Sequence, residues 1–497
     1  MSKYLNFILS ETIELIKRTH VITCIIILLF LISGCSEKLE GDLIIKNVAV
    51  INVKDGSVSA HKDIVIIKDR ISKIVAHRKN TTYLTNELID GKEQYIIPGL
   101  WDMHTHTWWA YQNFFPMLTV NGITGIREMW GDLEEIRKIR NKIDSGLVTG
   151  PDIISAGTIL DGNPPLFKGF DTTNSPDKAR GLVRKQKSEG ADFIKVYSYL
   201  ERDVYFAIAD ECKKAGIPFS GHIPFKISVE EAIKAGQGSL EHFFGILDYC
   251  SSEKAFLRTA MNSKQKNDSL FEARKFSTFL TRMKFETETF DKAKISALIT
   301  LLAKSDSWLC PTLIATEGSI NRSTPDFKPE KAIRYMPDYA IEGWQLPPDS
   351  TLTTLRTKNL KIENDWYNLI NSLFRQLKDG GVKFLAGTDF PNPNCYPGFS
   401  LHEELRIFVE KAGFTPLEAL QTATINPAVF LQIDKDMGTV ESGKNANLLI
   451  LRANPLENIN NTRQIEAVIQ RGKFYRTSVI QDSLELITRR SKSTIDK

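Results

Sequence analysis

The sequence of 497 residues has few of the features that mark a membrane, fibrous or nucleic-acid-binding protein. No apolar run reaches the about 20 residues that a membrane-spanning helix needs, which excludes a polytopic membrane protein. The 64 Lys and Arg against 60 Asp and Glu give a net charge of +4, and no basic cluster indicates binding of nucleic acid. Six cysteines are too few for a disulfide scaffold, and no two of those that follow the N-terminal segment have the spacing of a zinc ribbon. The remaining composition, with 42% hydrophobic and 25% charged residues, is that of a globular protein.

The first 34 residues are typical of an export signal. The apolar segment 21–32 follows basic residues, and as a helix it would span about 18 Å, less than the ~30 Å core of a bilayer. The letters ISGCS at 32–36 resemble the lipobox of bacterial lipoproteins, in which the cysteine carries the lipid. This resemblance predicts an exported chain anchored through Cys35 to the periplasmic or cell-surface side of a membrane. An uncleaved signal anchor is the alternative.

The middle of the chain alternates between strand-like and helix-like patterns. Eight short apolar runs, from YIIPGLWDMH to VKFLAGTDF, are separated by helical stretches, and β-hairpin patterns precede and follow them. This order predicts a closed parallel (β/α)8 barrel, with a doubly wound sheet as the alternative. We favour the barrel because polar residues stand at the ends of the runs. Two connections, 246–306 and 318–380, run about 60 residues each and are expected to form lids or substrate walls.

Two histidines follow the first of these runs with a spacing that suits a metal site. His104 and His106 stand at i and i+2, so on a strand both imidazoles point to the same side. Such a pair forms half of a site for a divalent ion. Lys195 stands in the run ADFIKVYSY, where it either reaches solvent from the strand end or is buried as a free amine. A buried amine with a lowered pKa can react with carbon dioxide and form an anionic carbamate.

Three further polar residues end later runs: His222 in FSGHIP, His242 in SLEHFFG and Asp389 in FLAGTDF. Each alone has a common structural explanation, such as a core histidine or a helix N-cap. In a barrel, however, the carboxyl ends of the strands meet at one mouth. We therefore expect these three residues to converge with the histidine pair and Lys195.

The chain resembles the amidohydrolase superfamily, in the branch of imidazolonepropionase-like and prolidase-like metal-dependent hydrolases. The resemblance runs from about residue 42 to 478 and is carried by IIPGLWDMHTH, GADFIKVY, SGHIPF, AGQGSLEH, LAGTDF, LHEEL, TPLEALQTATINPA and GTVESGKNANLLIL. It implies a (β/α)8 barrel flanked by a small β-sandwich that both chain ends build. The expected domains are a signal peptide at 1–34, sandwich segments at 35–94 and 435–497, and the barrel at 95–434.

The same resemblance implies a binuclear metal site. His104, His106 and Asp389 would bind one divalent ion, His222 and His242 a second, and a carbamate on Lys195 would bridge them. Zinc is the expected metal, with manganese and iron as alternatives. A hydroxide bridging the ions would attack the carbonyl of an amide, cyclic amide or dipeptide-like substrate, with Asp389 as general base and then general acid.

Five other residues are candidates for contacts with a small-molecule substrate. Tyr197, Tyr199 and Trp108 lie near the presumed ligands in the sequence, although each also suits a wall position. Arg127 is a candidate for binding a substrate carboxylate or for a structural ion pair, and His402 for a substrate contact or a helix start. Glu128 stands where the family commonly has an aspartate. This difference weakens any inference of the substrate from other members of the family.

Two other functions remain open on the sequence. A mononuclear deaminase or cyclic-imide hydrolase occurs in the same superfamily, although one-metal members usually lack the bridging lysine. A lipid-tethered binding protein without turnover is the alternative from another class, and retention of all six presumed ligands speaks against it. The sequence indicates no nucleic-acid partner and leaves homo-oligomerisation open.

Overall fold

The computed structural model describes residues 37–252, 271–322, 331–342 and 351–482, with isolated positions at 1, 14, 16, 17, 19, 20, 344, 484 and 485. The expected signal peptide at 1–34 falls outside these ranges except for the isolated positions, and Cys35 is also outside the described residues. Among the residues that are described, no helix combines the length and the apolar character needed to cross a bilayer.

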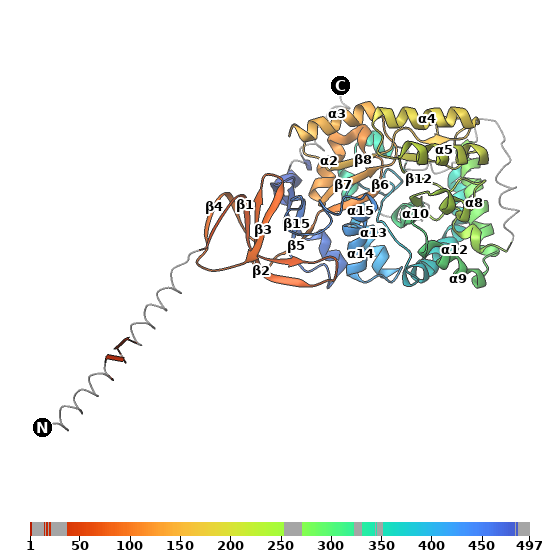
Figure 1. The fold of residues 1–497 in the computed structure, drawn as a ribbon. Coiled ribbons are helices and arrows are strands. Elements are labelled where there is room, and N and C mark those ends of the chain that lie inside the picture. The colour runs from red at the N-terminus through yellow and green to blue at the C-terminus, as the bar shows by residue number, and fades with distance from the viewer. Residues whose placement is uncertain are drawn as a thin grey trace.

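Both ends of the chain build one eight-stranded sheet beside the barrel. Its strands are β1 (Lys38–Ile51), β2 (Val58–Ile67), β3 (Arg70–Ala76), β4 (Thr82–Asp90), β5 (Tyr95–Pro98), β15 (Leu448–Leu451), β16 (Ile465–Gln470) and β17 (Lys473–Arg476). The two ends join where β5 pairs antiparallel with β15, with Pro98 opposite Leu448. Alternating aliphatic side chains such as Ile45, Ile64 and Ile450 fill the interior of this unit. In Figure 1 its orange and blue strands lie side by side at one end of the molecule.

The parallel strands of the barrel follow β5 directly. They are β6 (Leu100–Thr105), β7 (Ile123–Glu128), β8 (Asp152–Ser155), β11 (Ile194–Val196), β12 (Phe219–Gly221), β13 (Ser239–Glu241) and β14 (Trp308–Cys310), with two short strands, β9 (Leu160–Asp161) and β10 (Asp171–Thr172), after β8. The segment 384–390 takes the position of the eighth barrel strand, because Phe384 bridges to Leu309 in β14 and Phe390 bridges to Thr105 in β6. A bridge between Ala156 and Phe193 joins β8 to β11. The barrel therefore closes. This confirms the predicted fold, a (β/α)8 barrel with a β-sandwich beside it.

Helices surround the barrel, and several begin at side-chain N-caps. The helices between and after the strands are α2 (Tyr111–Val120), α3 (Leu133–Asp144), α4 (Pro176–Glu189), α5 (Arg202–Ala215), α6 (Val229–Ala235), α9 (Ile295–Ala303), α10 (Leu313–Asn321), α13 (Phe399–Glu410), α14 (Pro416–Thr422) and α15 (Ile425–Phe430). Side-chain N-caps begin α3, α4, α6 and α14. Ser228 begins α6 with a capping box to Glu231, and Gly236 ends it in the left-handed conformation. Such caps fix where each helix returns the chain to the next strand.

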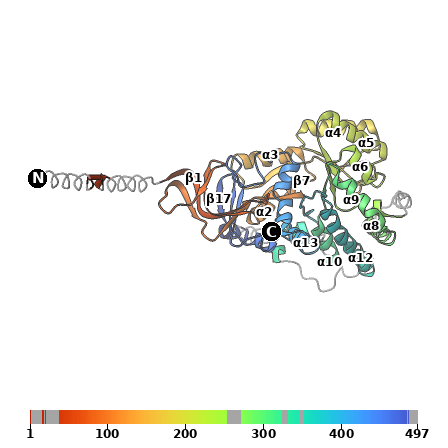
Figure 2. The same ribbon diagram turned by 60° about the horizontal axis from the view of Figure 1, so that its bottom comes forward.

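The two long connections contribute helices that extend past the barrel mouth. The first contains α8 (Phe271–Glu288), and the second contains α11 (Asp338–Ile341) and the 29-residue α12 (Thr351–Asp379). Trp366 in α12 donates its indole N–H to Glu286 in α8 at 2.5 Å, which ties the two helices together. Figures 1 and 2 show α8, α10 and α12 grouped on the side of the barrel away from the sandwich.

Candidate metal centre

The histidine pair at the end of β6 faces a single carboxylate. Nε2 of His104 lies 3.1 Å and Nε2 of His106 lies 3.4 Å from Oδ1 of Asp389. The two imidazole centroids are 5.5 Å apart, so the i and i+2 positions place both rings on one side of the strand end as expected. The ligand atoms of these three residues all lie within 4.8 Å of one another, which is close enough to hold one metal ion.

Asp389 is turned into the mouth by an unusual backbone conformation. Its φ of 54° lies in the left-handed region, and so do those of His242 (63°) and Thr312 (48°), although none of them is glycine. Such conformations cluster at functional sites, where the surrounding fold enforces them. The backbone N–H of Asp389 donates to the His104 carbonyl at 2.7 Å, and Asn392 donates to its Oδ2 at 2.6 Å. These bonds hold the carboxylate in one orientation.

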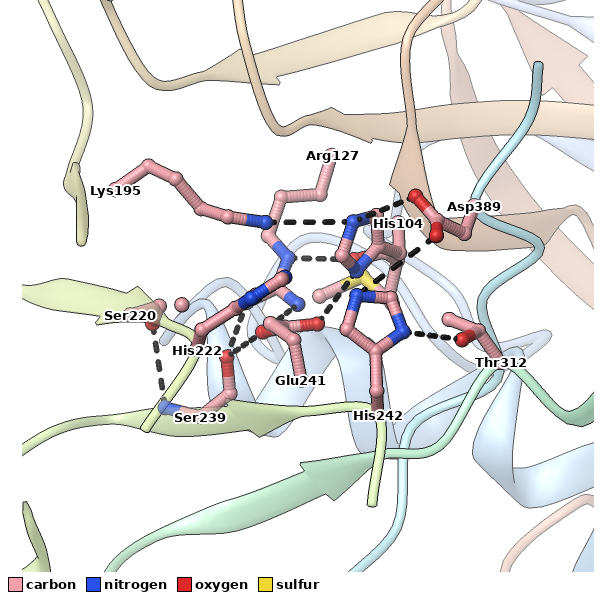
Figure 3. Close-up of polar contacts among 12 residues, drawn as sticks. His104, Arg127, Lys195, Ser220, His222, Ser239, Glu241, His242, Thr312 and Asp389 are labelled. Atoms are coloured by element: carbon pink, nitrogen blue, oxygen red, sulfur yellow. Dashed lines mark hydrogen bonds and ion pairs between the residues drawn. The ribbon is translucent and has the colours of Figure 1, made fainter. Parts of the chain in front are cut away.

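Lys195 in β11 is buried, and its amine points at the same group of side chains (Figure 3). Its Nζ lies 3.4 Å from Nε2 of His104. Burial lowers the pKa of this amine to about 8, although the carboxylates of Glu241 and Asp389 oppose the shift. The structure thus gives the buried placement, and the solvent-exposed alternative that the sequence allowed does not occur.

His222 and His242 complete the group from the ends of β12 and β13. Their ring centroids are 4.8 Å apart, and Nε2 of His242 lies 3.7 Å from Oδ2 of Asp389. Nδ1 of each ring has a hydroxyl partner, Ser198 at 2.9 Å for His222 and Thr312 at 2.6 Å for His242. Burial lowers the pKa of both histidines, to about 3 for His242. Both imidazoles are therefore neutral and able to bind a cation through Nε2.

The charges of the site are already set by these neighbours. Burial alone would disfavour the ionised carboxyl of Asp389, but the facing His104 and His242 hold its pKa well below the usual value. Burial lowers the pKa of His106 to about 4. The mouth thus presents one carboxylate among imidazoles, which is a donor set for zinc and similar divalent ions.

A buried ion pair behind the site orients His104, and its carboxylate, Glu241, was not singled out from the sequence. Nδ1 of His104 lies 2.7 Å from Glu241, and Arg127 donates to the other oxygen of Glu241 at 2.8 Å. Arg127 also donates to the Met103 carbonyl at 2.6 Å and to the Ser239 hydroxyl at 2.7 Å. A carboxylate in an apolar run such as GSLEHFFG needs a buried partner, which is the signal that could have found it. Arg127 thus forms a structural ion pair, which is one of the two roles considered for it, and not a contact with a substrate carboxylate.

Replacing Arg127 should strongly destabilise the protein. The Arg127→Met variant keeps most of the side-chain volume but leaves Glu241 buried without its cation, which we expect to cost about 3–5 kcal/mol of unfolding free energy. Urea unfolding followed by circular dichroism measures this change. The control is Arg452→Met, because Arg452 pairs with Glu466 at 2.9 Å on the surface, and such pairs contribute about 0–1 kcal/mol. Equal losses in the two variants would contradict the assigned role.

Glu128 lies behind His106 and is the departure from the family pattern noted above. One of its carboxyl oxygens accepts from the backbone and hydroxyl of Thr107 at 2.7 and 3.0 Å. The other lies 3.8 Å from Nδ1 of His106, too far for a hydrogen bond. Burial raises the pKa of Glu128 to about 8. The longer side chain therefore fixes the turn after β6 and stays beside the second histidine.

Of the residues predicted to contact substrate, Tyr197 and Trp108 lie near the mouth. The Tyr197 ring stacks on His222 with centroids 3.9 Å apart and lines the cavity described below. Trp108 packs edge-on against Trp130 at 6.2 Å. Tyr197 is thus placed to touch a bound molecule, while Trp108 belongs to an adjoining aromatic wall.

Tyr199 and His402 are not among the described residues that line this cavity. The backbone of Tyr199 donates to Asp161 at 2.7 Å. Nδ1 of His402 lies 2.9 Å from the Thr462 hydroxyl and Nε2 lies 3.0 Å from the Asn121 carbonyl, so both ring nitrogens are used inside the fold. This placement favours the structural alternative for His402.

A cavity of about 550 Å³ opens directly onto the site. Tyr197, His222, His242 and Asp389 form its base. Its walls are mostly apolar and come from the connections after β13 and β14, with Phe244, Phe279, Met283, Leu313, Ile320, Trp366 and Ile370 among them. The expected use of the long connections as substrate walls is consistent with this arrangement.

Comparison with known proteins agrees with this geometry. A model of the amidohydrolase family matches residues 345–475. Imidazolonepropionase from Deinococcus deserti is 38% identical over 79 residues, covering 16% of this chain and 19% of that protein. These matches support membership of the amidohydrolase superfamily and agree with the resemblance that the sequence indicates. They also support a hydrolase of the class that acts on carbon–nitrogen bonds.

Matches that cover more of the chain have lower sequence identity. Ochratoxinase from Aspergillus niger is 21% identical over 467 residues, covering 81% of this chain and 80% of that protein. A crystal structure of a Xaa-Pro dipeptidase with bound methionine in the active site superimposes with a TM-score of 0.62 at 21% identity, covering 87% of this chain and 99% of the dipeptidase chain. These similarities show a shared fold. Divalent metals are in general use in the family, and the clustered side chains offer a place for them.

Proposed function

We propose that this protein is a binuclear metal-dependent amidohydrolase that cleaves an amide bond in a cyclic amide or a dipeptide-like molecule. The observation that carries the proposal is the convergence of six side chains from five strand ends on one buried point, with Asp389 facing His104, His106 and His242. Three histidines around one ionised carboxylate form a set of metal ligands, whereas a histidine with only a structural role needs no such common centre.

The residues fit a pair of divalent ions. Burial lowers the pKa of His106, His222 and His242, and the Nδ1 contacts of His104, His222 and His242 leave each Nε2 directed at the centre. His104, His106 and Asp389 would hold one ion, and His222 and His242 the other. Lys195 would bridge them as a carbamate, since its buried amine has a lowered pKa and can add carbon dioxide.

The protein's own groups then perform the proton transfers. When bound, two divalent ions polarise a carbonyl and acidify a water molecule. Asp389 is ionised and is held by Asn392, so its carboxylate accepts a proton from the attacking water and delivers it to the leaving nitrogen. Tyr197 and the apolar walls position the substrate and exclude bulk water.

Metal content and a substrate screen together test the proposal. We expect purified full-length protein to bind about two divalent ions per chain, measured by inductively coupled plasma mass spectrometry, and to hydrolyse members of a set of dipeptides, N-acyl amino acids and cyclic amides. About one ion per chain with activity would instead support a mononuclear deaminase or cyclic-imide hydrolase. Two ions without any turnover in the screen would support a binding protein.

A further inference from the structure

The wall of the cavity opposite the metal centre is rigid and aromatic. Phe244 stacks on Trp366 with centroids 5.7 Å apart and an interplanar angle of 18°, and Phe279 packs against Phe244 at 5.1 Å. The indole of Trp366 is anchored to Glu286, which also accepts from Arg282 at 2.8 Å. This wall therefore has a fixed shape and suits a flat or bulky apolar group.

One face of helix α12 lines the cavity, and its lining residues change from apolar to polar along the helix. Ile370, Trp366, Glu363 and Arg356 all line the cavity, and their spacing returns to the same side of the helix. The helix leads into the barrel segment that ends at Asp389, so its N-terminal half extends past the strand ends and over the mouth. Glu363 and Arg356 thus lie on the outer part of the cavity, beyond the aromatic wall.

Glu363 is a buried carboxyl whose hydrogen-bonding capacity is not used. Its exposed fraction is 3%, and Oε2 has no hydrogen-bond partner within the part of the chain that the structure describes. Oε1 lies 4.0 Å from Nη1 of Arg356, at the outer limit of an ion pair. Burial raises the pKa of Glu363 to about 7, and Arg356 only partly opposes this shift. A buried carboxyl in this state costs stability, unless a bound molecule supplies the missing donor.

Arg356 is less suited to bind an anion at the same place. Its Nη1 lies 3.4 Å from the backbone carbonyl of Ser319 and 3.3 Å from the hydroxyl of that residue. A substrate carboxylate there would also face Glu363, and the two like charges would repel in a cavity of low dielectric. The available oxygen of Glu363 therefore favours a donor with positive charge.

We propose that Glu363 binds a protonated amine on the substrate, so that the molecule is an amide with a bulky apolar group and a basic nitrogen at its far end. This inference rests on the proposed function, because it takes the metal centre as the point of cleavage. The apolar group lies along Phe244 and Trp366, and the ammonium donates to Oε2 of Glu363. A hydrogen bond to a charged group of this kind corresponds to about 10- to 100-fold in affinity.

Matched ligands separate recognition from turnover. We expect 5-phenylpentylamine to bind the full-length, metal-loaded protein about 10- to 100-fold more tightly than 5-phenylpentan-1-ol, by isothermal titration calorimetry. In Glu363→Gln, which keeps the side-chain shape, this ratio should fall to about one. Asp365→Asn is the control, because Asp365 is on the same helix and pairs with Lys361 at 2.5 Å outside the cavity lining. The control should keep the wild-type ratio.

Turnover of matched dipeptides gives a second readout. The pairs are Phe-Lys with Phe-norleucine and Lys-Phe with norleucine-Phe, which differ only in that hydrogen replaces the side-chain ammonium. We expect a preference in kcat/KM for one lysine member, lost in Glu363→Gln. Hydrolysis without any preference for lysine, together with equal binding of the amine and the alcohol, would overturn this inference and leave the proposed function standing. Tight amine binding that depends on Glu363 without hydrolysis of any amide would overturn the proposed function alone.

Discussion

The Asp389→Asn variant is expected to lose about two to four powers of ten in kcat while it keeps most of its metal. The amide retains an oxygen where Oδ1 faces His104 and His106, so the ions lose charge compensation but not every contact. It cannot accept a proton, and proton transfer by a positioned side chain contributes about 10²–10⁴-fold to rate. Steady-state kinetics and metal content measured on the same preparation test both parts.

Two results would contradict the role given to Asp389. A variant with near-normal kcat would show that another group moves the proton. A variant without metal would show only a ligand role, because the loss of rate would then follow from the empty site. Asp365→Asn serves as a control for the same charge change, since Asp365 pairs with Lys361 away from the cavity.

The Lys195→Ala variant is expected to bind metal at least about tenfold more weakly and to lose nearly all activity. Loss even of a side chain that only supports a ligand costs about 10–100-fold in metal affinity, and Lys195 is proposed to contact both ions. The deletion also leaves a space beside His104 into which a small carboxylate can fit. Acetate or propionate should therefore restore part of the metal content and part of the activity.

Urea unfolding of the metal-free proteins is the control for the Lys195→Ala prediction. Removing a buried amine relieves its desolvation, so the metal-free variant should unfold in urea no earlier than the metal-free wild type. Full activity without added carboxylate would eliminate the carbamate. Normal metal content that does not respond to acetate would eliminate the bridging role of Lys195.

The candidate site could be predicted from the sequence because its residues stand at strand ends. The spacing of His104 and His106 already determines that both imidazoles share one side, and the order of strands in a barrel brings Lys195, His222 and Asp389 to one mouth. These inferences need only the period of a strand and the closure of the sheet. The geometry around Asp389 agrees with both.

The supporting residues could not be predicted in the same way. Glu241 and Arg127 meet only because β13 and β7 face each other across the barrel interior, and neither sequence neighbourhood indicates its partner. Likewise, the packing of α8 on α12 depends on a contact such as Trp366 with Glu286, between two connections whose lengths alone indicate little. Residues that pair only in the tertiary structure produce no periodic pattern in the sequence, so their partners cannot be predicted from it.

The pairing of β5 with β15 has a consequence for how the protein is made. The strands from the beginning of the chain are synthesised first, and the partners that cover β5 are synthesised last. Until then β5 is an apolar edge with unpaired backbone groups, which is a template for aggregation. Pairing across nearly the whole chain length also slows folding. The nascent chain therefore exposes this edge of β5 until β15 has been synthesised.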